Sequence, residues 1–134
     1  MIEVVIDSSG AILGRLASHV AKQSLLGKKV IVVNCDRVII AGNRTNIVAE
    51  WSHATRRGGH SLKGPFVPRK NSEKMVKRTI RGMLSYRQGR GLDAFKRIRC
   101  YATVPTEYES AKKITLLRPK KNQTIQLSEL SKVI

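Results

Sequence analysis

The chain has 134 residues, of which 26 are lysine or arginine and only nine are aspartate or glutamate, so its formal net charge is +17. This length suits one domain, and a hydrophobic content of 41% is enough for one core, which excludes wholesale disorder. So large a positive charge repels itself and predicts a polyanionic partner, either nucleic acid or an anionic membrane surface. No apolar run approaches the roughly 20 residues that cross a bilayer, and the opening MIEVVID predicts no signal peptide.

Short apolar runs alternate with helical periodicity in the first fifty residues. The predicted elements are strands over residues 3–7, 30–33 and 38–41, a helix over residues 13–24, and a second helix that begins at Gly42 and Asn43. The run at 30–33 is apolar on both faces, which is typical of a buried parallel strand. In the second helix, Ile47, Val48 and Trp51 share an inner face. This order predicts an α/β sheet with parallel pairing and right-handed crossovers.

Positive charge is concentrated in the middle of the chain. Residues 51–100 carry fourteen basic and two acidic side chains, net +12, whereas residues 1–50 carry net +2 and residues 101–134 net +3. Within this block, residues 56–68 (RRGGHSLKGPFVP) contain repeated Gly and Pro and fit no regular period, which predicts a long basic loop. We expect such a loop to become ordered only when an anionic partner binds it.

Residues 70–84 predict an amphipathic helix with a basic ridge. On a helical wheel Val76, Ile80 and Met83 share one face, which we expect to dock on the sheet. The opposite face carries five cations, namely Lys70, Lys74, Lys77, Arg78 and Arg81. Like charges four residues apart repel, and only Glu73 offsets them. Because an ordinary solvated face mixes both signs, the ridge favours contact with nucleic acid.

The remaining elements are less regular. We expect a short helix within residues 87–99, with Leu92, Phe95 and Ile98 inward, and then a strand over residues 100–104. Residues 124–127 predict an extended segment, followed by a short helix with Ser128 as N-cap and Leu130, Val133 and Ile134 along it. A helix that short is stable only if it docks on the core.

Signals for catalysis or metal binding are weak. The segment from Gly10 to Arg15 follows a strand and opens a helix, but it matches neither a dinucleotide fingerprint nor a Walker loop, so we interpret it as a turn beside a phosphate-contacting Arg15. The histidines lack metal-ligand spacing, and the nine acids form no clustered pair, so neither a zinc site nor a metal-dependent nuclease is favoured. Cys35 and Cys100 lie 65 positions apart, which suits free buried thiols in a reducing compartment. We predict no catalytic residues, no metal and no cofactor.

Two segments, AILGRLASHVAKQSLLGKKVIVVNCDRVIIAGN (11–43) and KRTIRGML (77–84), resemble the universal L-thirteen family of large-subunit ribosomal proteins in its archaeal and eukaryotic form, over roughly residues 2–104. The resemblance implies a three-layer α/β/α fold with a central four-stranded, mainly parallel sheet, plus a basic loop and helix. It also implies a non-enzymatic constituent of the cytoplasmic ribosome that binds large-subunit rRNA and takes part in early subunit assembly. Neighbouring large-subunit proteins are implied partners, whereas a membrane or a small-molecule substrate is not. A small nucleotide- or phosphate-handling α/β enzyme is the alternative.

The expected RNA contacts are basic side chains outside the predicted core. They are Arg15, Arg56, Arg57, His60, Lys63, Arg69, Lys70, Lys74, Lys77, Arg78, Arg81, Arg87 and Arg90. We expect a single domain over residues 1–134, with three parts. These are an α/β core half (1–55), a basic rRNA-binding loop and helices (56–99), and a last strand with the C-terminal tail (100–134).

Overall fold

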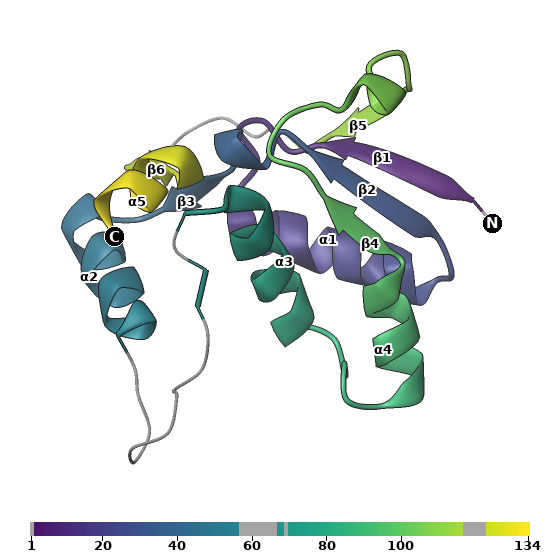
Figure 1. Ribbon diagram of the computed structural model, residues 1–134, viewed down its shortest axis with the longest axis horizontal. Coiled ribbons are helices and arrows are strands. Elements are labelled where there is room, and N and C mark those ends of the chain that lie inside the picture. Colours follow the sequence, from purple (N-terminus) through teal and green to yellow (C-terminus); the bar gives the residue numbers. More distant parts are fainter. Residues whose placement is uncertain (1, 57–66, 69, 117–122) are drawn as a thin grey trace.

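The computed structural model describes residues 2–56, 67–68, 70–116 and 123–134 (Figure 1). The helices are α1 (Leu13–Leu25), α2 (Arg44–Thr55), α3 (Ser72–Gly82), α4 (Gly89–Lys96) and α5 (Leu127–Val133), with short 3-10 helices η1 (Cys35–Arg37) and η2 (Thr106–Tyr108). The strands are β1 (Glu3–Asp7), β2 (Lys29–Val33), β3 (Ile39–Ala41), β4 (Ile98–Cys100), β5 (Lys113–Thr115) and β6 (Thr124–Gln126). The strands and helices expected in the first half are therefore confirmed within one or two residues.

A four-stranded parallel sheet forms the centre of the fold, in the order β4-β2-β1-β5. Its register pairs Val5 with Ile31 in the β1–β2 ladder and Val32 with Cys100 in the β2–β4 ladder. Parallel neighbours need a crossover, which α1 supplies between β1 and β2. The sheet is flanked by helices, as expected for a three-layer α/β/α fold.

Strand alternation divides the buried side chains between the two faces of the sheet. Ile6, Val30, Val32 and Ile98 belong to the main core, on the side where α1, α3 and α4 lie (Figure 1). Val5, Ile31 and Val33 form a smaller cluster on the other face. That cluster is covered by the chain that follows β4 and includes η2, through Tyr101, Val104, Tyr108 and Ala111. Both faces are thus covered, as a parallel sheet requires.

The strand expected at residues 38–41 forms, but it lies outside the parallel sheet. β3 pairs antiparallel with β6 in a separate two-stranded sheet, while β5 completes the central sheet. The amide of Leu127 donates to the carbonyl of Val38 at 2.9 Å, and Leu127 and Leu130 of α5 are buried against the core. The expectation of Ser128 as N-cap is wrong, because Gln126 occupies the cap position and Ser128 Oγ instead contacts its side-chain oxygen at 3.3 Å.

Helix α3 buries one face against α1, β4 and η1. Val76 and Ile80 are fully buried, as expected. The expectation for Met83 is wrong: this side chain is 45% exposed, since the helix ends at Gly82 and the amide of Met83 donates to the carbonyl of Ile80, three residues back, in a tighter turn. Met75, in contrast, is fully buried. Helix α3 contacts neighbouring elements on several sides, so its buried surface is wider than the one face that the helical wheel predicts.

The short helix expected within residues 87–99 forms as α4, but Ile98 lies outside it. The helix ends at Lys96, and Ile98 begins β4, two residues earlier than the strand expected at 100–104. Leu92 was expected to face inward but is 37% exposed. Gly91 and Ala94 are the buried positions of α4, so the helix approaches the core through two small residues.

Replacing Ile80 with Ala tests the packing of α3. Because Ile80 is fully buried, Ile80→Ala should lower the free energy of unfolding by about 2–5 kcal/mol. Met83→Ala is the matched control at an exposed site, and it should change the same quantity by about 0.5 kcal/mol or less. Urea denaturation of both variants measures the difference, and equal losses would contradict the burial described here.

Candidate nucleic-acid interface

The face of α3 opposite its buried side is basic, as the helical wheel predicts. Lys70, just before the helix, is exposed, as are Lys74 and Arg81, whereas Lys77 and Arg78 are half-buried. We call these five residues the α3 ridge. Glu73 is the one acidic residue of α3, and no ion pair joins it to the ridge among the residues that the structure describes.

The ridge lacks carboxylate partners within the described part of the chain. The ion pairs present there join Lys29 to Glu3 at 3.7 Å and Arg44 to Glu129 at 3.4 Å, both on other elements. Like charges on adjacent helical turns repel one another, so the ridge has the charge that suits an external polyanion.

Two aromatic side chains hold ridge cations in place without neutralising them. Lys77 Nζ lies 5.1 Å from the centroid of the Phe95 ring. The guanidinium carbons of Arg81 and Arg87 lie 4.9 Å and 5.7 Å from the centroid of Tyr86. A cation over an aromatic face gains electrostatic attraction while it keeps its full charge. Tyr86 thus gathers two predicted RNA contacts, Arg81 and Arg87, at one place.

The turn between α3 and α4 depends on a glycine in the next helix. The amide of Gln88 donates to the carbonyl of Ser85 at 3.1 Å and closes this turn, which carries Tyr86 and Arg87. A Cβ added at Gly91 would lie 2.1 Å from the same Ser85 oxygen. Gly91 therefore permits a close approach that no other residue allows, and this approach positions the aromatic ring and its arginine.

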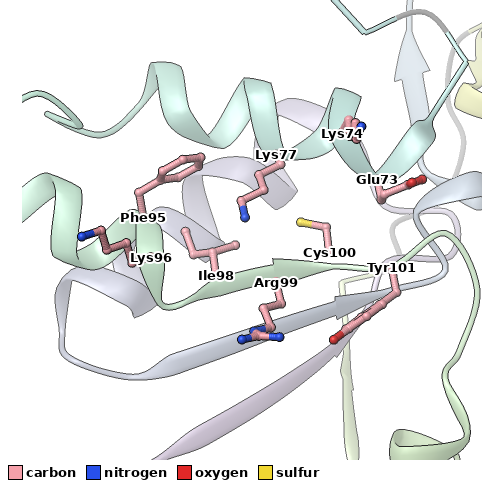
Figure 2. Close-up of a pocket in the computed structure, with 9 residues that line it drawn as sticks. All are labelled: Glu73, Lys74, Lys77, Phe95, Lys96, Ile98, Arg99, Cys100 and Tyr101. Carbon is pink, nitrogen blue, oxygen red and sulfur yellow. The ribbon is translucent and has the colours of Figure 1, made fainter.

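A cleft opens between α3 and β4, with a volume of about 550 Å³ (Figure 2). It is lined by Glu73, Lys74, Lys77, Phe95, Lys96, Ile98, Arg99, Cys100 and Tyr101. A smaller hollow of about 180 Å³ shares Lys74, Lys77 and Phe95 with it and is also lined by Pro68, Arg78 and Arg81. The structure therefore brings four ridge cations to the rims of two adjoining hollows.

The other predicted contacts lie on separate elements or outside the described residues. Arg15 is exposed at the start of α1, Arg56 is exposed at the end of α2, and Arg90 is exposed in the first turn of α4. The predicted contacts that fall outside the described residues are Arg57, His60, Lys63 and Arg69, together with most of the predicted loop over residues 56–68.

Sequence reasoning missed several residues of this surface. Phe95 was expected to serve only the core, and Lys96 and Arg99 were not selected, although both line the cleft. The positive charge of Lys96 and Arg99 could have indicated them as RNA contacts, but the pairing of β4 with β2 decides where these side chains lie. In contrast, Arg97 of the same basic stretch is structural, because its guanidinium donates to the carbonyl of Ser24 in α1.

The chemistry available elsewhere is limited within the described residues. No group of three or more His, Cys, Asp or Glu side chains there could hold a metal ion. Cys35 is buried and Cys100 half-buried, both as free thiols. A hydrogen bond shared with Cys100, together with burial, raises the pKa of Cys35, so its thiol stays protonated.

No described helix is long and apolar enough to cross a membrane.

The turn before α1 uses its own amides. Gly10 N–H donates to the carbonyl of Arg37 at 3.0 Å, and Ala11 N–H donates to the carbonyl of Ser8 at 3.1 Å. Gly10 adopts a φ of +71°, which favours glycine. This geometry supports the interpretation as a structural turn, because these two amides are already bonded within the protein.

Comparison with known proteins gives a consistent family. Residues 2–107 match the family model described as Ribosomal protein L13. The chain is 44% identical over 113 residues to the large ribosomal subunit protein uL13 of Methanosarcina barkeri, covering 84% of this chain and 79% of the relative. It is 36% identical over 133 residues to the uL13 protein of Methanococcoides burtonii, and the match covers 96% of this chain and 94% of the relative. The identity to the uL13 protein of Archaeoglobus fulgidus is 42% over 105 residues, and the match covers 78% of this chain and 66% of the relative.

Gly91→Ala tests the close approach beneath Tyr86. The added Cβ must displace the Ser85 carbonyl, so the variant should lose about 1–3 kcal/mol of unfolding free energy, as overpacked sites do. Gly89→Ala is the matched control in the same helix, where a Cβ meets nothing within 4 Å, and helix propensity should leave it neutral or stabilised by up to about 1 kcal/mol. Thermal unfolding compares the two, and similar stabilities would refute the steric argument.

Proposed function

The chain belongs to the ribosomal protein L13 family, and from this we propose that it binds large-subunit rRNA through phosphate contacts centred on the α3 ridge. The observation that carries the proposal is the ridge itself. Lys70, Lys74 and Arg81 are exposed, Lys77 and Arg78 are half-buried, and no ridge cation has a carboxylate partner among the described residues. RNA phosphates supply the missing negative charge at high density.

The family assignment also decides between the two classes of function raised by the sequence. The relatives are large ribosomal subunit proteins, so this chain is a ribosomal protein of the cytoplasmic large subunit that serves translation, and it is not an enzyme. The alternative of a small nucleotide- or phosphate-handling enzyme is therefore wrong.

Phosphate recognition suits the residue types on this surface. Arginine presents a planar fork of donors that matches two phosphate oxygens, whereas lysine acts as a mobile point charge. Tyr86 holds Arg81 and Arg87 in fixed directions before RNA arrives, which reduces the entropy lost when they bind. Only 4% of the residues are aromatic, so stacking on many bases is not the main mode of binding.

The proposed contact surface extends beyond the ridge. We assign the further phosphate contacts to Arg15, Arg56, Arg57, His60, Lys63, Arg69, Arg87 and Arg90. Residues 56–99 then form the main rRNA-binding part of a single domain, between the core half (1–55) and the last strand with the tail (100–134). Because the surface recognises RNA phosphates, it needs no preformed protein site, which supports binding early in large-subunit assembly, before neighbouring proteins join.

Salt dependence of rRNA binding tests this proposal. If about half of the cations of residues 51–100 engage phosphates, the slope of log affinity against log salt concentration should be steeper than about −4. Lys70→Ala combined with Lys74→Ala should flatten the slope by up to about 1 unit per lost contact. The same variant should change stability by about 0.5 kcal/mol or less, because both side chains are exposed.

A second double variant is the control for net charge. Lys22→Ala combined with Lys132→Ala removes two exposed lysines of α1 and α5 that are not part of the ridge. Filter binding of both double variants to a large-subunit rRNA transcript across a potassium chloride series should show a smaller effect for the control. A slope near zero for the unaltered protein, or equal losses in the two variants, would contradict the proposal.

A further inference from the structure

We propose that the cleft between α3 and β4 binds one unpaired nucleotide of the rRNA, with the base against Phe95 and the phosphate between the lysines of the rim. This inference rests on the proposed rRNA-binding function and adds a base-binding site to it. A phosphate-only surface needs no cleft, whereas this hollow offers apolar walls beside its cations.

The cleft has the size and the lining of a site for a small organic group. Its volume of about 550 Å³ falls within the range of about 300–1,000 Å³ found for small-molecule sites. Figure 2 shows Ile98 and Cys100 pointing from β4 toward α3, with Phe95 at one end and Lys77 directed into the space between. Apolar walls with a few cations suit a flat base that carries a phosphate.

The charge of the lining selects an anionic ligand. Lys74, Lys77, Lys96 and Arg99 line the cleft, and Glu73 is its one acidic residue. In Figure 2 Lys77 lies on the same side of β4 as Ile98, and Arg99 lies on the other side. A nucleotide satisfies both features, because its base fits the apolar walls and its phosphate fits the basic rim.

In the free protein Lys77 occupies the face of Phe95 on which we propose that the base stacks. Lys77 Nζ lies 5.1 Å from the ring centroid, where it covers one aromatic face. A phosphate at the rim attracts this ammonium group more strongly than the ring does, because a full negative charge replaces a quadrupole. Movement of Lys77 to the phosphate then uncovers the ring face on which a base can stack.

An unsatisfied donor lies beside the cleft. The Nε of Arg78 is buried and has no hydrogen-bond partner among the described residues, and Arg78 lines the smaller hollow next to Lys77 and Phe95. A buried N–H group without an acceptor is unfavourable, and phosphate oxygens are strong acceptors. Arg78 also lines the smaller hollow with Lys74 and Arg81, so a second phosphate of the same strand would meet a cluster of cations there.

An extended peptide is the competing occupant, because β4 is an edge strand of the sheet. Strand addition would use the free backbone groups of β4, which select for no charge. Four cations against one acid disfavour any peptide that is not strongly acidic, whereas every nucleotide carries the complementary charge. The observations therefore favour RNA.

Photochemical cross-linking locates the occupant directly. The full chain bound to a large-subunit rRNA transcript is irradiated with short-wavelength ultraviolet light, and nucleotide-carrying peptides are mapped by mass spectrometry. We expect a nucleotide adduct within residues 95–101, which include Phe95, Cys100 and Tyr101. The same irradiation of assembled large subunits should give the same adduct.

Phe95→Leu supplies the energetic test. Leucine keeps an apolar side chain in the wall but removes the stacking face, so affinity for the transcript should fall about fivefold or more. The slope of affinity against salt should stay unchanged, because no charge is lost. Leu92→Ala is the matched control, since Leu92 is 37% exposed on the same helix and does not line the cleft, and it should leave affinity unchanged.

The outcomes separate this inference from the proposed function. Salt-dependent binding with no adduct in residues 95–101 and with Phe95→Leu equal to Leu92→Ala would overturn the base-binding cleft and leave phosphate binding in place. A peptide of another ribosomal protein cross-linked at these residues in assembled subunits would also overturn it. Binding without salt dependence would contradict the proposed function itself.

Discussion

The burial of one face of α3 against α1 and β4 is the contact on which the rest of the structure depends. Met75, Val76 and Ile80 are fully buried there, and each such side chain contributes about 1.5–3 kcal/mol relative to an exposed one. Repulsion between like charges on adjacent turns costs only a few tenths of a kcal/mol per pair. Packing therefore exceeds repulsion, and the helix can present a row of cations with Glu73 alone to offset them.

This balance leaves the α3 ridge in need of a counter-charge. The ion pairs within the described residues lie on other elements, so no described residue relieves the repulsion among the ridge cations. Tyr86 and Phe95 fix the directions of Arg81 and Lys77 while leaving their charge intact. The protein thus holds its cations in an arrangement that becomes favourable when RNA phosphates surround it, which suits a constituent of the large ribosomal subunit.

Much of the fold could be predicted from the sequence because local periodicity determines it. The apolar spacing that buries Leu16 and Val20 in α1 is visible in the chain, as is the uninterrupted run that forms β2. The position of β3 outside the central sheet could not be predicted. It depends on pairing with β6, which is distant in the sequence, and on the docking of α5. Met83 was misplaced because a helical wheel has no information about where a helix ends.

In the candidate site, too, features set by local spacing could be predicted and features set by distant contacts could not. Four of the five cations of the α3 ridge follow from spacing within one helix, and Lys74 and Arg81 are exposed on it as the wheel predicts. The cleft was not predicted, since it requires Phe95 and Arg99 to meet α3 across the chain reversal that leads into β4. Similarly, the role of Gly91 becomes visible only when the Ser85 carbonyl is placed beside it.

If rRNA is the counterion of this protein, as proposed, the free protein is weakened by its own positive charge. The most direct measurement is the free energy of unfolding of the RNA-free protein, obtained by urea denaturation across a potassium chloride series. Salt screens repulsion among exposed charges, so stability should rise as salt increases, although rRNA affinity falls. A stability that stays constant or decreases with salt would contradict it.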